Sequence, residues 1–101
     1  MPPTVLLINP TYKQPGVLDE YFPKSLPLSL GFLIGVLLEN NIEVILIDEQ
    51  FEKMTVDKVE RLVRQHNIRV IGFTVLTTVA FHVYDQCLAL RKTLPDLRIV
   101  L

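Results

Sequence analysis

Residues 4–10 read TVLLINP, a run of apolar and β-branched side chains that ends at an asparagine and a proline. An uninterrupted apolar run of this kind is typical of a parallel strand whose two faces are both covered. Three further apolar runs follow, at residues 44–47, 70–73 and 97–101, and the segments between them have helical patterns. This alternation predicts an α/β domain built on a parallel sheet.

Three segments between these strands are predicted to be helices. Residues 28–40 are apolar on nearly every side, so we expect this helix to be buried on more than one side and to end at Asn40 or Asn41. Residues 56–66 have one apolar face, with Thr55 as the N-cap. The third helix follows the spacing i, i+3, i+4, i+7 and i+8. Its apolar residues are Ala80, Val83, Tyr84, Cys87 and Leu88.

The strand order follows from the right-handed connections of parallel sheets. A β-α-β-α-β-α-β chain of this size corresponds to most of a flavodoxin-like, doubly wound (Rossmann-like) sheet, with the order 2-1-3-4. The last predicted strand reaches Leu101 with no turn or helix after it. We therefore expect residues 1–101 to form one truncated α/β domain, whose fifth strand and last helix are missing.

The composition is that of a single globular domain: 50% of the 101 residues are hydrophobic, 21% are charged, and the formal net charge is −1. A chain of this size buries roughly two-thirds of its unfolded surface, enough for one core. The near-neutral charge gives no electrostatic reason to expect a nucleic acid or an anionic membrane as partner. Cys87 is the single cysteine, and the N-terminus lacks the features of a secretion signal, so we expect a cytoplasmic protein.

Ligands of doubly wound sheets bind at the carboxyl ends of the strands, near the switch point between the first and third strands, where the strand order reverses. Residues 9–11 and 74–78 lie there in the predicted topology. A phosphoacceptor receiver would need acidic residues where Asn9 and Thr74 stand. Residues 9–14 form neither a glycine-rich phosphate loop nor the G-x-G-x-x-G of a dinucleotide fold, so these three chemistries are excluded.

Several motifs, in their order and spacing, are similar to those of a known family. They are residues 5–10 (VLLINP), Phe22-Pro23, residues 30–34 (LGFLI) with Leu37-Leu38, Glu43-Val44-x-x-Ile47-Asp48, and residues 71–77 (IGFTVLT). Together they span essentially the whole chain. This series resembles the N-terminal cobalamin (vitamin B12)-binding domain of cobalamin-dependent radical S-adenosylmethionine (SAM) enzymes.

The resemblance implies that the chain is one domain of a larger enzyme and that another domain carries out the reaction. In that family the domain precedes a barrel that holds a four-iron cluster on a C-x-x-x-C-x-x-C motif, and many members methylate or rearrange carbon. This chain contains no such motif. The implied partners are cobalamin and the C-terminal radical SAM domain of the parent enzyme, where the iron–sulfur cluster and SAM would lie. The chain itself is expected to contribute no catalytic residue and no metal ligand.

The resemblance also assigns the cofactor site. Residues 9–11 would lie against the edge of the corrin ring, and residues 74–76 match a Ser-x-Leu element that lines the slot for the nucleotide tail. The D-x-H-x-x-G signature is absent after the first strand, so cobalamin would bind without a protein histidine on cobalt. The cofactor-binding residues implied in this way are Asn9, Pro10, Thr11, Thr74, Val75, Leu76, Thr77 and Thr78.

These positions also have purely structural interpretations. Asn9 and Asp48 are able to end strands by bonding nearby backbone. His66 and His82 are expected at the surface, and Cys87 is expected to be a small core residue. Two alternatives to cobalamin binding therefore stay open: a cofactor-free domain for interaction or assembly, and a sensor of another small ligand.

The expected lack of a fifth strand and a last helix has a consequence for association. It would leave the strand edge at residues 98–101 open and an apolar side of the first helix uncovered. We therefore expect self-association through the first helix or the fourth-strand edge. The helix residues expected to be exposed are Phe32, Leu33, Val36 and Leu37.

Overall fold

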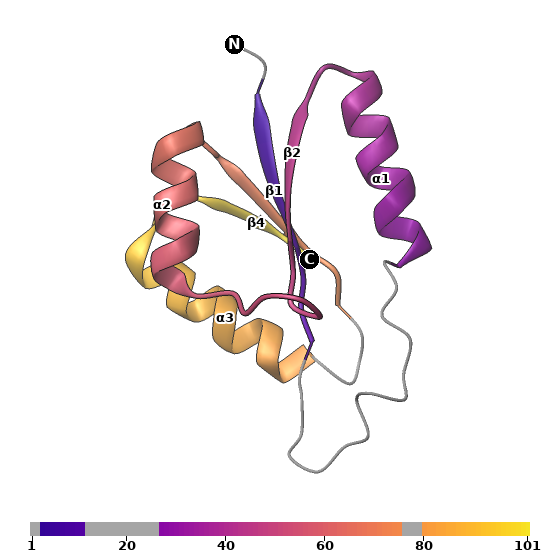
Figure 1. Cartoon of the computed structure of the whole chain (residues 1–101). Coiled ribbons are helices and arrows are strands. Elements are labelled where there is room, and N and C mark those ends of the chain that lie inside the picture. The colour runs from indigo at the N-terminus through magenta and orange to yellow at the C-terminus, as the bar shows by residue number, and fades with distance from the viewer. Residues whose placement is uncertain (1–2, 12–26, 76–79) are drawn as a thin grey trace.

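The computed structural model describes residues 3–11, 27–75 and 80–101 of the chain. Within these residues, parallel strands alternate with helices (Figure 1). The strand order is 2-1-3-4, which confirms the predicted flavodoxin-like α/β sheet. In chain order the elements are β1 (Thr4–Asn9), α1 (Leu28–Glu39), β2 (Glu43–Asp48), α2 (Val56–His66), β3 (Val70–Phe73), α3 (Ala80–Thr93) and β4 (Arg98–Val100).

The strand β1 lies inside the sheet and pairs in parallel with β2 on one side and β3 on the other. The pairing continues just beyond the regular strands. The backbone N–H of Glu49 donates to the carbonyl of Asn9 at 2.9 Å, and that of Thr74 donates to the carbonyl of Ile8 at 3.1 Å. These bonds hold the residues that follow β2 and β3 close to the end of β1.

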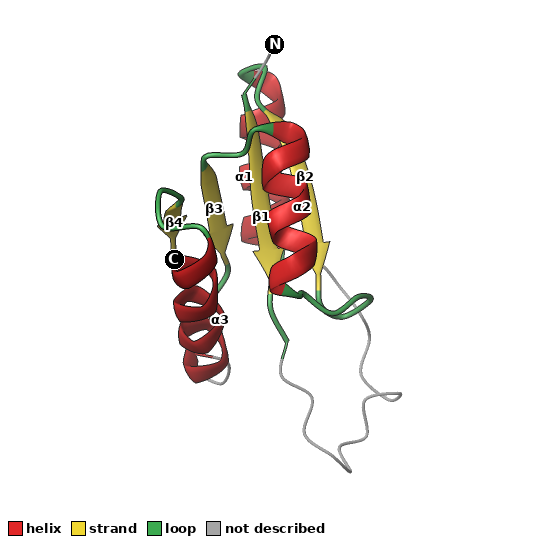
Figure 2. Ribbon diagram, turned by 90° about the vertical axis from the view of Figure 1, so that its left-hand side faces the viewer, coloured by secondary structure: helices red, strands yellow, loops and turns green. Residues whose placement is uncertain are grey.

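The sheet separates the helices into two unequal layers. Figure 1 shows α2 and α3 on one face and α1 on the other, and in Figure 2 α2 lies in front of β1 and β2 while α1 lies behind them. Successive strand side chains point to opposite faces. Leu6 and Ile8 therefore enter the main core with α2 and α3, while Leu7 is buried outside that core. The main core also contains Ile47, Met54, Val59, Ile68, Ile71, Phe73, Val83, Leu90 and Leu97.

The helix ends follow the local signals in the sequence. Thr55 is the N-cap of α2, because its Oγ1 accepts a hydrogen bond from the backbone N–H of Lys58 at 3.2 Å. Asn41, just after α1, and Asn67, just after α2, both adopt the left-handed conformation, with φ of 60° and 51°. Asparagine tolerates this conformation better than most residues, so it ends a helix at little cost. The predicted N-cap and the predicted end of α1 are confirmed.

The burial of α1 differs from the expectation that the helix is covered on more than one side. Leu30 is its buried residue, whereas Phe32, Leu33 and Val36 are 69%, 45% and 54% exposed. No other helix in the described part of the chain lies on this face of the sheet, so the outer side of α1 stays open. The predicted exposure of these three residues is confirmed, and Leu37 is only partly exposed. Among the described residues, no helix is both long and apolar enough to span a membrane.

The orientation of α3 differs in part from the prediction. Leu90 and Gln86 are buried, while Tyr84 and Leu88, which the periodicity placed on the inner side, are exposed. On the inner side of the helix the Gln86 side-chain amide donates to Glu49 Oε1 at 2.9 Å, and this bond compensates for the burial of the amide.

The predicted apolar face is confirmed for Val83, which is buried in the main core, and for Cys87, which packs against it. It is wrong for Tyr84 and Leu88, because the amide of Gln86 occupies part of the buried face.

The orientation of α3 can be tested with two leucines of the same helix. Leu90 is 0% exposed and Leu88 is 64% exposed. Leu90→Ala is expected to lower the free energy of unfolding by about 2–5 kcal/mol, because it opens a cavity in the main core. Leu88→Ala, the control, is expected to change it by less than about 0.5 kcal/mol. Urea unfolding at one protein concentration measures both, and equal losses would contradict this orientation.

Candidate functional site

The carboxyl ends of the three longest strands meet at one edge of the sheet (Figure 2). Polar residues stand at these ends. Asn9 and Asp48 are the last residues of β1 and β2 and lie opposite each other in the parallel register. Thr74 comes directly after β3. The sheet therefore brings together three polar side chains that are far apart in the sequence, at the edge where folds of this type bind ligands.

These side chains form a continuous hydrogen-bond chain. Thr74 Oγ1 donates to Asn9 Oδ1 at 2.8 Å, and Asn9 Nδ2 donates to Asp48 Oδ1 at 3.2 Å. Gln50 completes it, because its backbone N–H donates to Asp48 Oδ1 at 3.0 Å and its side-chain amide lies 3.2 Å from both carboxylate oxygens. Asn9 and Asp48 are both buried. A buried network satisfied in this way stiffens the ends of all three strands.

The structure brings some of the predicted cofactor-binding residues together. Asn9 and Thr74 are in direct contact through their hydrogen bond. Pro10 is buried and Thr11 is half-buried beyond the end of β1, whereas Val75 is exposed beyond β3. The other three predicted positions lie outside the described residues. They are Leu76, Thr77 and Thr78.

A second polar cluster at this edge was missed by sequence reasoning. Glu49, whose side chain is only 5% exposed, accepts hydrogen bonds at Oε1 from His82 Nε2 at 3.1 Å and from Gln86 Nε2 at 2.9 Å. Its Oε2 accepts a bond from the backbone N–H of Met54 at 3.1 Å. The available signals were an acidic residue one position after a buried strand and two polar residues spaced i, i+4 on a helix.

The two histidines therefore have different surroundings. His82 was expected at the surface, but it is partly buried because its ring is held by the carboxylate of Glu49. His66 is exposed, as predicted, and lies at the end of α2.

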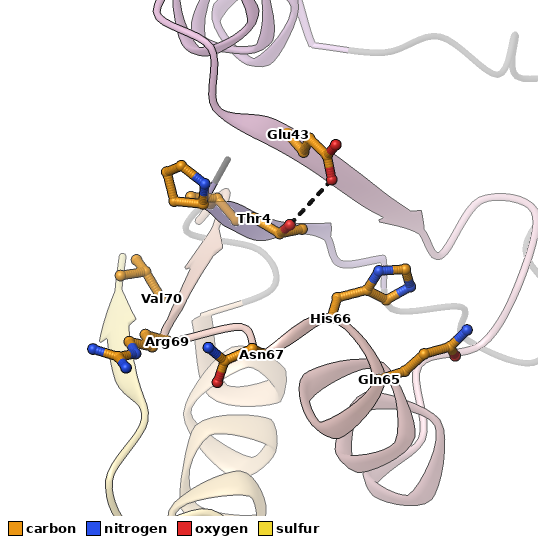
Figure 3. A pocket seen from close by; sticks show the side chains of 9 residues that line it. Thr4, Glu43, Gln65, His66, Asn67, Arg69 and Val70 are labelled. Atoms are coloured by element: carbon orange, nitrogen blue, oxygen red, sulfur yellow. Dashed lines mark hydrogen bonds between the residues drawn. The ribbon is translucent and has the colours of Figure 1, made fainter. Parts of the chain in front are cut away.

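Two hollows lie at opposite ends of the sheet. The hollow at the amino end, of about 510 Å³, is shown in Figure 3. There Thr4 Oγ1 donates to Glu43 Oε2 at 3.3 Å, and the side chains of His66 and Arg69 are exposed to solvent. Since Asn9 and Thr74 are at the other end of the strands, this larger hollow is separate from the predicted site.

The hollow at the carboxyl end, which we call the edge pocket, has a volume of about 430 Å³. It adjoins the end of β1 at Thr11 and extends to Glu49 and His82 of the second polar cluster. Its lining residues are Thr11, Glu49, Gln50, Phe51, Glu52, Lys53 and His82.

Cys87 has the surroundings of a structural residue. It packs against the main core, and burial raises the pKa of its thiol, although the nearby charge of Arg91 acts in the opposite direction. The prediction of a small core residue is confirmed. Among the described residues, no group of three or more His, Cys, Asp or Glu side chains is arranged to hold a metal ion.

Comparison with known proteins identifies a similar enzyme of known structure. No family model matches the chain, and no curated protein matches it. The chain is similar to the cobalamin-dependent S-adenosylmethionine radical enzyme OxsB with aqua-cobalamin and S-adenosylmethionine bound, at a TM-score of 0.59 and 28% identity. The same enzyme with aqua-cobalamin bound gives a TM-score of 0.58 and 28% identity.

The similarity covers 97% of this chain and 13% of the OxsB chain in both structures. The chain therefore spans about an eighth of the length of that enzyme. Nearly all of the chain takes part in the match, which confirms the resemblance to cobalamin-dependent radical SAM enzymes inferred from the sequence motifs.

The hydrogen bond between Thr74 and Asn9 can be tested by paired substitutions. Thr74→Val preserves the shape of the side chain but leaves Asn9 Oδ1 without its donor, so we expect the free energy of unfolding to fall by about 1–3 kcal/mol. Thr74→Ser retains the hydroxyl and is expected to recover most of this loss. Thermal or urea unfolding measures the difference. Equal stabilities of the valine and serine variants would show that the bond is unimportant.

Proposed function

We propose that this chain is a cobalamin-binding module that works with a radical SAM region. The observation that carries the proposal is the match of nearly the whole chain to an enzyme whose structure contains aqua-cobalamin, at 28% identity. The carboxyl edge of the sheet, with Asn9 and Thr74 in contact, is the proposed cofactor face.

The residues at this edge fit a large neutral ligand with many polar groups. Val75 offers exposed apolar surface, and the hydroxyl of Thr74 keeps acceptor capacity after donating to Asn9. The hydroxyl oxygen of Thr11 is buried without a hydrogen-bond partner among the described residues. An edge that combines apolar contact with unused hydrogen-bond capacity is typical of a site for an organic cofactor.

We further propose that cobalamin is bound without histidine on the cobalt. His66 lies at the amino end of the sheet, away from Asn9 and Thr74. His82 lies at the carboxyl end, but its Nε2 is engaged by Glu49. Neither arrangement supports a protein ligand to cobalt.

The role of the chain in catalysis would be positional. Cobalamin, when bound, supplies organocobalt chemistry, and the protein supplies binding and orientation. The stiff network at the strand ends, which includes Asn9 and Asp48, suits a surface that holds the cofactor in one orientation.

We propose that the parent is a methyltransferase or a related enzyme that forms or rearranges bonds to carbon or sulfur, and that the iron–sulfur cluster and SAM belong to its other regions. The alternatives are a cofactor-free assembly domain and a sensor of another small ligand.

Cobalamin binding is tested with hydroxocobalamin. We expect the purified protein to retain a red species through gel filtration, and Thr74→Val to weaken binding by roughly 0.5–1.5 kcal/mol, the typical contribution of one hydrogen bond. Absorption titration measures the affinity. At saturation, His66→Ala and His82→Ala are expected to leave the positions of the visible bands unchanged, because neither imidazole is a cobalt ligand.

The matched control is Thr4→Val, which makes the same substitution at the other end of the sheet, where Thr4 bonds Glu43. It is expected to leave the affinity unchanged. A colourless protein fraction would favour the cofactor-free alternative. Equal effects of the two threonine substitutions on the affinity would contradict a cofactor site at the carboxyl edge. A shift of the visible bands in a histidine variant would refute binding without a histidine ligand on cobalt.

We also propose that two copies of the chain associate through α1 or the edge of β4. Phe32 and Val36 are exposed on α1, and β4 pairs with β3 alone among the described strands. Burying ~300 Å² of apolar surface on each copy contributes roughly 15 kcal/mol at ~25 cal/mol per Å². This is comparable with the upper end of the cost of association, about 4–15 kcal/mol.

Sedimentation equilibrium at micromolar concentration tests this association. We expect a mass that rises above the 11.6 kDa of one chain as the concentration increases. Phe32→Glu is expected to shift the population to monomer, because it places a charge in the contact. The control is Phe81→Glu, at an exposed phenylalanine on α3. A single 11.6 kDa species at all concentrations would refute self-association, and dissociation by the Phe81 change alone would place the contact on α3.

A further inference from the structure

We draw no further inference here: the strongest candidate, the exposed apolar outer face of α1 that includes Phe32 and Val36, carries nothing beyond the self-association already proposed, because nothing in the structure shows what covers it.

Discussion

The parallel pairing of β1 with both of its neighbours is the constraint on which the rest of the structure depends. Because β1 lies between β2 and β3, the ends of three strands meet at one edge. Asn9, Asp48 and Thr74, which are dozens of residues apart in the chain, become hydrogen-bond partners there. A shift of one residue in either pairing would turn alternate side chains to the other face and separate these groups.

The two polar networks at this edge hold the segments around the site in one geometry. The first network runs from Thr74 through Asn9 to Asp48, and the second is centred on Glu49 and reaches α3. Buried polar groups contribute stability only when their hydrogen bonds are made, so each network ties the surrounding segments to one geometry.

The two faces of the sheet are covered to different extents. The covered face holds the core that stabilises the fold, and the other face leaves apolar surface exposed. The main core lies on the side of α2 and α3, where Leu6, Ile71 and Leu90 are fully buried. On the other face α1 lies alone among the described helices and leaves Phe32 and Val36 exposed. A helix that is apolar on nearly every side but covered on only one is suited to contact with further protein.

The sequence by itself determined the helices and strands and the helix ends, because apolar periodicity and capping residues such as Thr55 act locally. It also determined the strand order, because connections between parallel strands are right-handed in nearly all proteins. It also located Asn9 and Thr74, since strand ends can be read from the pattern. Only the tertiary structure decided that His82 and Gln86 turn inward to Glu49. Apolar spacing assigns the inner face of a helix to apolar residues, and a polar contact across the fold has no period in the sequence to predict it.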